Sequence, residues 1–290
     1  MEANFQKIKC PICGFDDAEF YATKKGYNFC RSKNCGLIFI WPIPKDINIY
    51  NADYFCGATN GYGYTDYDKD KAPMLKTFGK YLEIIGKYSK KRGHLLDIGT
   101  ATGYFLKIAD DKGWQCFGVE ISDYAAKKAR EKGLNVLTGT LESADLPKNY
   151  FDAITMWDIL EHLNNPQRNI EILSGLLKSD GVLAINTPDS SSFWARLLGK
   201  KWHLILPPEH IFLFSRKSLK ILLEKNGFEI LKLEKIGKSF TLSYIFNTLY
   251  KWQGIALWNK LANLFKGDFW SKMVVPINFR DSIFVIARKI

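Results

Sequence analysis

Residues whose types and spacing suit chemistry are concentrated between His94 and Phe105, where an apolar run ends in an aspartate and a loop of small residues. Residues 95–98 would form a short buried strand, while Gly99 and Gly103 permit tight turns and a close approach of the backbone to a ligand. A helix that starts after this loop would present free backbone N–H groups. This order of strand, loop and helix is typical of a site for a nucleoside cofactor.

The loop discriminates between two kinds of cofactor. A dinucleotide site needs the pattern G-x-G-x-x-G, because the pyrophosphate rests against the start of the helix. In this chain Ala101 stands at the second glycine position and Tyr104 at the third. The carboxylate of Asp97 would repel a pyrophosphate and attract an ammonium or sulfonium group. S-adenosylmethionine carries both cations, so the sequence predicts this cofactor.

A second acidic residue follows at a matching distance. Residues 114–119 form another strand-like run, which ends at Glu120. Glu120 lies about twenty residues beyond Gly99, the spacing at which an acidic side chain contacts ribose hydroxyls in doubly wound folds. Ser122 and Asp123 then offer the start of a helix.

With these residues in place, the stretches 95–105, 151–166 and 177–188, together with Glu120, resemble the class I S-adenosylmethionine-dependent methyltransferases. Within that class the chain is most similar to the ubiquinone-biosynthesis-like O-methyltransferases and to the sugar C-methyltransferases that carry an N-terminal zinc module. The loop departs from the family pattern at Ala101, where glycine is usual, and we expect a slight cost because alanine is small. The loop and the resemblance together give these candidates for cofactor binding: Asp97, Gly99, Thr100, Ala101, Gly103, Tyr104, Glu120, Ile121, Thr140, Leu141, Trp157 and Asp158.

The rest of the chain alternates between strand-like and helix-like patterns. This alternation and the resemblance predict an α/β fold with a doubly wound, seven-stranded methyltransferase sheet. A helix is expected at 73–88, before the first strand. In the family the last strand runs antiparallel to its neighbour. Strands are expected at 94–98, 114–119, 135–137, 153–156, 182–186, 228–233 and 282–287.

Composition shifts divide the chain into three segments. A zinc-ribbon-like module is expected at 1–45, a connector over the active site at 46–72, and the methyltransferase domain at 73–290. That domain contains an insert at 238–279, in which aromatic residues alternate with lysines. Such a pattern suits a pair of helices that lies on an anionic membrane or grips a lipid-linked substrate. A helical cap packed on the domain or on a second subunit is the alternative.

Four of the six cysteines form two pairs, Cys10-Pro-Ile-Cys13-Gly and Cys30-x4-Cys35-Gly. Four thiolates suit tetrahedral zinc, and a segment of about forty residues is too small to bury an adequate core without a metal. We expect a structural zinc ion on Cys10, Cys13, Cys30 and Cys35, since four protein ligands leave no position for substrate. Disulfides are the alternative, which the lack of an apolar signal segment disfavours.

The catalytic candidates follow the fourth and fifth strands of the expected sheet. The resemblance implies that the D-x-x-E-H segment Asp158–His162 borders the pocket for cofactor and substrate. In the stretch 207–215, His210 has an intrinsic pKa suited to a general base that removes the acceptor's proton during an in-line methyl transfer. Glu209 would orient His210 or bind a sugar hydroxyl. Structural packing of His162 and His210 is the alternative.

These expectations favour O-methylation of a small molecule, namely a sugar or a lipid-linked glycan. The zinc-bearing sugar C-methyltransferases have a tyrosine shortly before their E-H pair, whereas this chain has Pro207 and Pro208. The departure favours oxygen as the acceptor and leaves C-methylation of a nucleotide-linked keto sugar as the alternative. An RNA methyltransferase or nucleic-acid-binding protein is disfavoured, because Trp157-Asp158 stands where amino-group methyltransferases of nucleic acids carry an N-P-P-Y-like tetrapeptide.

Composition bounds the remaining choices. A chain of 290 residues with 47% hydrophobic residues can form one large domain with a small appendage. Its net charge of +11 favours an acidic partner such as a phosphorylated sugar or lipid, an anionic membrane or nucleic acid. Residues 1–9 lack an apolar signal segment, and no run of about eighteen apolar residues could span a bilayer. We therefore expect a cytoplasmic protein, with peripheral contact at the inner membrane face.

Overall fold

The computed structural model describes residues 8–44, 52–56, 67–235, 238–265, 267, 270, 273–277 and 279–290. Most of the expected connector at 46–72 therefore lies outside the described residues. Its described parts contain two short helices, α1 (Ala52–Cys56) and α2 (Tyr67–Lys71).

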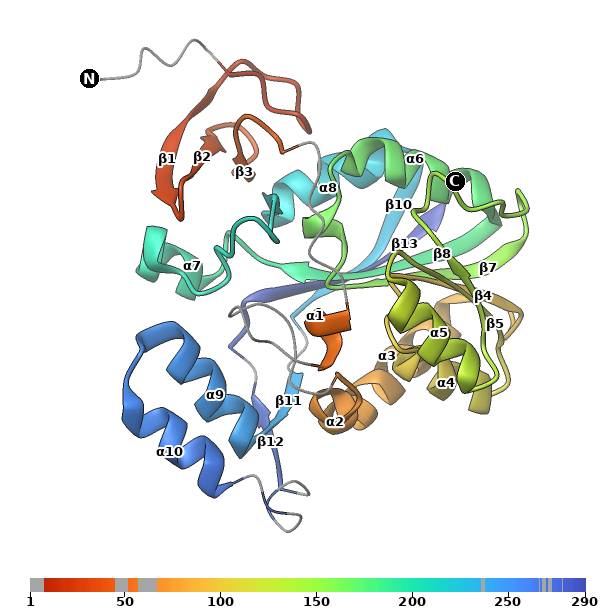
Figure 1. The fold of residues 1–290 in the computed structure, drawn as a ribbon. Coiled ribbons are helices and arrows are strands. Elements are labelled where there is room, and N and C mark those ends of the chain that lie inside the picture. Colours follow the sequence, from red (N-terminus) through yellow and green to blue (C-terminus); the bar gives the residue numbers. More distant parts are fainter. Residues whose placement is uncertain are drawn as a thin grey trace.

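A seven-stranded sheet forms the centre of the molecule (Figure 1). Its strand order is β10-β13-β8-β7-β4-β5-β6, and β13 runs antiparallel to both β8 and β10. Each strand that the sequence predicts is present, as is the antiparallel last strand, so the predicted fold class is confirmed. The strands are β4 (His94–Ile98), β5 (Gln115–Glu120), β6 (Asn135–Thr138), β7 (Phe151–Trp157), β8 (Leu177–Pro188), β10 (Phe228–Glu234) and β13 (Ser282–Lys289).

Helices cover both faces of this sheet (Figure 1). Leu95 belongs to a core cluster with Phe105 on one face, whereas Leu96 belongs to a cluster with Leu173 on the other. Successive side chains of a strand point to opposite faces, so consecutive apolar residues require cover on both. One face carries η1 (Ala72–Met74), α3 (Leu75–Tyr88), α4 (Tyr104–Asp111) and α5 (Asp123–Glu131). The other side has η2 (Leu160–His162), α6 (Pro166–Leu176) and α8 (Arg216–Lys225), while α7 (Phe193–Leu198) and η3 (Gly199–Lys201) follow β8.

The N-terminal residues form a small antiparallel sheet that a distant strand completes. The order is β1 (Ala18–Lys24), β2 (Tyr27–Ser32), β3 (Ile38–Ile40) and β9 (Phe212–Leu213). Three side chains of the α8 region bond to the N-terminal backbone: Ser215 Oγ donates to Cys35 O at 2.5 Å, Lys217 Nζ to Asn34 O at 2.5 Å and Lys225 Nζ to Ile12 O at 2.9 Å. The N-terminal module is thus joined to the larger domain by a shared sheet and by direct hydrogen bonds.

The insert before β13 contains the expected pair of helices, α9 (Leu242–Gln253) and α10 (Ala256–Leu264). Phe246 of α9 stacks on Trp258 and on Phe265, with ring centroids 5.9 Å and 5.5 Å apart. The two ends of the insert pair as an antiparallel ribbon of β11 (Lys238–Thr241) and β12 (Val274–Ile277). The sequence analysis predicted the insert but not this ribbon. No helix in the described part of the chain is both long and apolar enough to cross a membrane.

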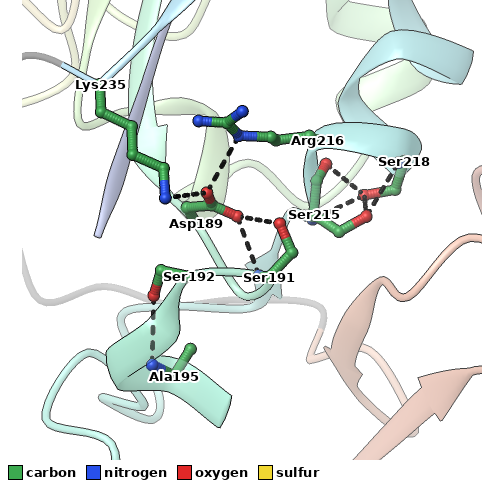
Figure 2. Close-up of polar contacts among 8 residues, drawn as sticks. All are labelled: Asp189, Ser191, Ser192, Ala195, Ser215, Arg216, Ser218 and Lys235. Carbon is green, nitrogen blue, oxygen red and sulfur yellow. Dashed lines mark hydrogen bonds and ion pairs between the residues drawn. The ribbon is translucent and has the colours of Figure 1, made fainter. Parts of the chain in front are cut away.

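A buried carboxylate fixes the segment that leaves β8 (Figure 2). Asp189 is fully buried, and its Oδ1 accepts hydrogen bonds from Ser191 N at 2.9 Å and Ser191 Oγ at 2.5 Å. Its Oδ2 lies 3.4 Å from Arg216 Nε and 3.9 Å from Lys235 Nζ. Its N–H donates to Asp281 O at 2.8 Å. One residue therefore ties the approach to α7 to the start of α8, the end of β10 and the start of β13.

Replacing Asp189 by alanine is expected to lower the free energy of unfolding by about 2 kcal/mol, because hydrogen bonds to a charged acceptor are lost inside the protein. Arg216→Met should cost less than about 1 kcal/mol, because the Arg216 side chain is 43% exposed and water screens its charge. Chemical denaturation followed by circular dichroism measures both changes. Equal losses for the two variants would contradict a central role for the carboxylate.

Candidate cofactor pocket and catalytic residues

A pocket lies at the carboxyl ends of β4, β7 and β8, where the strand-to-helix loops of a parallel sheet meet. The predicted cofactor residues that line it are Asp97, Gly99, Thr100, Tyr104, Trp157 and Asp158. Other lining residues were not predicted as site residues: Tyr67, Lys71, Met74, Phe78, Tyr81, Phe105 and Asn186. Several of these belong to α2, η1 and α3, so the described end of the connector forms part of the pocket wall.

Asp97 gives the pocket its electrostatic character. It lies at the end of β4, is buried, and accepts a hydrogen bond of 2.6 Å from Thr155 Oγ1 on β7. Burial raises the pKa of Asp97 to about 7. A cation placed in this pocket would stabilise the charged carboxylate, whereas an anion would meet repulsion.

Glu120 holds the loops that follow β4 and β5. Its Oε2 accepts a hydrogen bond from the N–H of Ala101 at 2.8 Å, and its Oε1 accepts one from the N–H of Ser122 at 2.9 Å. Burial raises the pKa of Glu120, although these hydrogen bonds oppose the shift. Glu120 is not among the residues lining the described pocket, so its contact with a ribose stays a prediction.

The loop after β4 contains three residues in the left-handed conformation, Gly99, Ala101 and Gly103, with φ of 72°, 52° and 81°. A Cβ atom at Gly103 would lie 2.5 Å from Leu134 Cδ1 and 3.0 Å from Ala129 Cβ, so glycine lets α4 begin close to α5. The methyl group of Ala101 costs about 1 kcal/mol in this conformation. The slight cost expected at Ala101 therefore has a backbone origin.

Within the described part of the chain, Trp157 Nε1 and Asn186 Oδ1 in the pocket lining are buried without a hydrogen-bond partner. The Trp157 ring packs against Tyr81 and Phe284, with centroids 4.7 Å and 6.1 Å apart. Asn186 Nδ2 donates to Asp158 Oδ1 at 2.7 Å. One remaining donor, one remaining acceptor and a buried carboxylate among aromatic rings fit a cationic nucleoside cofactor.

Three further cofactor candidates do not line this pocket. Ile121 and Thr140 are exposed, whereas Leu141 is buried in the core. Gly139 N donates to Glu120 O at 2.9 Å, so the Thr140 loop does lie beside the end of β5. Their contact with the cofactor stays a prediction.

The catalytic candidates form a second group next to the pocket. Glu161, His162 and His210 each place one nitrogen or oxygen atom within 4.8 Å of the others, and the two imidazole centroids are 4.9 Å apart. Thr187 Oγ1 donates to Glu161 Oε2 at 2.8 Å, and Thr187 directly follows the pocket residue Asn186. Asp158, which lines the cofactor pocket, also interacts with His162, so the group adjoins the pocket although its histidines do not line it.

Hydrogen bonds define the orientation of both imidazoles. His162 Nδ1 lies 2.8 Å from Glu209 O, and His210 Nδ1 lies 2.6 Å from Leu204 O. A carbonyl oxygen only accepts, so each Nδ1 carries a proton and each Nε2 of the neutral rings holds a lone pair. Burial lowers the pKa of His162, which favours its neutral form. The pair thus offers basic nitrogens for proton transfer.

The structure brings together three of the four cysteines that were predicted to bind zinc. Cys10, Cys13 and Cys35 place their Sγ atoms within 4.8 Å of one another, but Cys30 is not part of this group. Cys30 lies within β2, opposite Phe20 of β1 and Phe39 of β3. Its position in the ladder of the small sheet explains why it is buried without joining the other thiols.

A doubly wound sheet with an acidic, buried pocket at its carboxyl edge and no dinucleotide glycine pattern defines a class I S-adenosylmethionine-dependent methyltransferase. A family model described as a methyltransferase domain matches residues 72–233. That match covers more than half of the chain, so the protein belongs to this methyltransferase family.

Curated relatives share part of the chain. A protein of Methanocaldococcus jannaschii is 29% identical over 58% of this chain and 79% of its own length. The 2-methyl-6-phytyl-1,4-hydroquinone methyltransferase 2 of Oryza sativa subsp. japonica is 27% identical over 54% of this chain and 44% of its own length. The ubiquinone biosynthesis O-methyltransferase of Nitrosomonas europaea is 29% identical over 43% and 57%. The chain thus spans about half the length of these two enzymes.

Solved structures share the fold. A methyltransferase dependent on S-adenosylmethionine from Archaeoglobus fulgidus matches with a TM-score of 0.51 and 21% identity, over 74% of this chain and 94% of its own. Another from Aquifex aeolicus matches with a TM-score of 0.50 and 18% identity, over 76% and 95%.

The pKa of Asp97 predicts how cofactor affinity depends on pH. Because a cation binds the charged carboxylate, affinity for S-adenosylmethionine should fall roughly tenfold for each pH unit below about 7 and level off above it. Calorimetric titration across this range measures the dependence. Asp97→Asn, which keeps the shape of the side chain, should bind weakly with little dependence on pH. An unchanged affinity of the natural protein between pH 5.5 and pH 7 would contradict the role of Asp97.

Proposed function

We propose that this methyltransferase transfers the methyl group of S-adenosylmethionine to a hydroxyl group of a sugar or lipid-linked glycan. The observation that carries the proposal is the Glu161, His162 and His210 group beside the cofactor pocket. A hydroxyl acceptor must lose a proton during transfer, and a neutral imidazole is suited to accept it near pH 7.

Each residue of the site has a distinct part in this mechanism. When bound, S-adenosylmethionine supplies a methyl group on a positively charged sulfur. The Asp97 carboxylate attracts that cationic cofactor, while the indole N–H of Trp157 is available to a polar atom of the cofactor or substrate. His210 Nε2 accepts the proton of the acceptor hydroxyl, and the nearby Glu161 carboxylate stabilises the imidazolium that results.

The name of one relative supports an acceptor that carries a lipid-like chain. The names of the two relatives describe an enzyme acting on a phytyl hydroquinone and an O-methyltransferase of ubiquinone biosynthesis. The first name gives a hydroquinone with a phytyl group, and the second gives transfer of a methyl group to oxygen. The glycan assignment rests on the resemblance at the Glu209-His210 pair, and the assay must therefore compare glycans with quinols.

Incubation of the protein with S-adenosylmethionine labelled in its methyl group tests the reaction against nucleotide sugars, lipid-linked glycans and quinols. His210→Ala should lower the turnover of an accepted substrate by about 10²–10⁴ while the dissociation constant of the cofactor stays unchanged. His94→Asn is the matched control, because His94 stacks on Tyr150 at the start of β4, away from the carboxyl edge. Equal turnover of the natural protein and His210→Ala would remove His210 from the mechanism.

The label also identifies the atom that is methylated. A label retained as an O-methyl ether supports the proposal. A keto sugar that carries deuterium on the carbon beside its ketone is the second probe. Loss of this deuterium during the reaction would instead assign C-methylation of a keto sugar. Methylation of quinols alone would confirm the chemistry and reject the glycan.

We further propose that the acceptor is reached from an anionic membrane surface. Phe193 and Leu197 of α7 are 66% and 62% exposed, and Trp194 beside them is also exposed. The cations on and after this helix are Arg196, Lys200 and Lys201, all exposed. Apolar side chains flanked by cations are complementary to the acyl boundary and the phosphates of an anionic bilayer. The described part of the insert adds exposed Leu257 and Leu264 on α10, and Figure 1 draws α7 and α10 on the same side of the molecule.

Sedimentation with lipid vesicles tests this surface. The protein should bind vesicles that contain phosphatidylglycerol, and the double variant Phe193→Ser/Leu197→Ser should bind at least about tenfold more weakly, because buried apolar area is lost. Leu75→Ser, on a similarly exposed residue of α3, is the matched control. Undiminished binding by the double variant would reject the surface. A dimer that the double variant dissociates would show a protein interface there instead.

A further inference from the structure

The side chains that lie together in the N-terminal module are not the four cysteines that the sequence predicts as zinc ligands. Cys10 Sγ and Cys35 Sγ lie 3.6 Å apart, and Cys13 belongs to the same buried group. Ser32 Oγ lies 3.6 Å from Cys13 Sγ and 3.3 Å from Cys35 Sγ. A hydroxyl oxygen therefore stands beside the three sulfur atoms, where Cys30 was expected.

The backbone explains why Ser32 takes this place. Gly14 N donates to Cys10 O at 3.0 Å, and Gly36 N donates to Ser32 O at 3.0 Å. Both glycines follow a cysteine and have positive φ, at 83° and 73°. The segments Cys10–Gly14 and Ser32–Gly36 are therefore two copies of the same turn, and Ser32 corresponds to Cys10. Two such turns that face each other form the usual cage of a zinc ribbon.

The distances suit a tetrahedral metal ion. With Zn–S bonds of about 2.3 Å and a Zn–O bond of about 2.0 Å, the edges of a tetrahedron measure about 3.8 Å between sulfurs and about 3.5 Å between sulfur and oxygen. The observed separations of 3.6 Å and of 3.3 Å to 3.6 Å are close to these edges. The three thiols and the hydroxyl thus fit a zinc ion with little rearrangement.

Asp17 orients the hydroxyl group. Ser32 Oγ donates to Asp17 Oδ1 at 2.9 Å, and Asn34 N donates to Asp17 Oδ2 at 2.5 Å. Because its proton points to Asp17, the hydroxyl directs its lone pairs elsewhere, and the N–H and Sγ of Cys35 approach it at 3.2 Å and 3.3 Å. A carboxylate behind a metal ligand holds the ligand in place and increases its electron density.

We propose that the N-terminal module binds zinc through the thiolates of Cys10, Cys13 and Cys35 and the hydroxyl oxygen of Ser32, with Asp17 as the positioning residue. Binding releases the three thiol protons, while the serine proton stays in its hydrogen bond to Asp17. Cys30 is a core residue of β2 and not a ligand. A neutral hydroxyl binds zinc less strongly than a thiolate, so one corner of the site is weaker than in a four-cysteine ribbon.

Cobalt substitution in the full-length protein tests the ligand set, because the intensity of the thiolate-to-cobalt charge-transfer band increases with the number of thiolates. The natural protein and Cys30→Ala should bind one cobalt ion and give the same three-thiolate spectrum. Ser32→Cys should give a band larger by about one third, shift the d–d bands, and bind zinc more tightly in competition with a chelator. Loss of a thiolate band in Cys30→Ala, or a four-thiolate spectrum in the natural protein, would overturn the proposal.

The role of Asp17 needs a separate readout. Asp17→Asn should weaken zinc binding by about 10-fold to 100-fold while the three-thiolate cobalt spectrum is retained. Circular dichroism of the zinc-loaded variants verifies that each has folded. Unchanged zinc affinity in Asp17→Asn would remove Asp17 from the site, and failure of the folded natural protein to bind cobalt or zinc would reject the site. Neither readout depends on S-adenosylmethionine or on the methyl acceptor.

Discussion

The segments that meet beyond strand β8 depend on the fully buried carboxylate of Asp189, the residue that follows this strand. A buried charge is stable only when hydrogen bonds and opposite charges surround it. Its partners come from the turn before α7, the start of α8 and the end of β10. The neighbouring Ser190 N donates to Phe214 O, and Ser190 Oγ donates to Gly36 O of the N-terminal module. Satisfying this charge brings the turn before α7, the start of α8 and the end of β10 together, and Ser190 links the same corner to the N-terminal module.

Asp97 and Glu120, near the ends of the neighbouring strands β4 and β5, are two buried carboxylates with different roles. Glu120 has backbone N–H donors on both oxygens, which makes it a structural link between two loops. Asp97 accepts side-chain hydrogen bonds from Thr155 and Thr100 and lines the pocket, where its carboxylate can meet a cation.

Local pattern predicted the sheet well, because apolar runs of strand length and their order are properties of neighbouring residues. It did not predict β9, a strand of two residues that pairs only because Ile38 and Leu213 are brought together by the whole fold. The same limit applies to the site. Asp97 was recognisable from its loop, whereas Asn186 and the pocket-lining residues of α2 carry no local signal. Counting cysteines selected Cys30, since a serine at position 32 has no metal-binding signature until the matching turns are seen.

The sheet shared by β3 and β9 has a consequence for how such modules are inherited. A zinc ribbon that ended at its own last strand could be gained or lost as one continuous segment. Here the fourth strand, Phe212–Leu213, begins two residues after His210, and the residues that bond to the cysteine turns come after that strand, far from the N-terminal segment in sequence. Transfer of the N-terminal segment alone would leave β3 with an unpaired edge, which favours association with other chains. We therefore expect that related proteins gain or lose the N-terminal segment together with the stretch that contains His210 and β9.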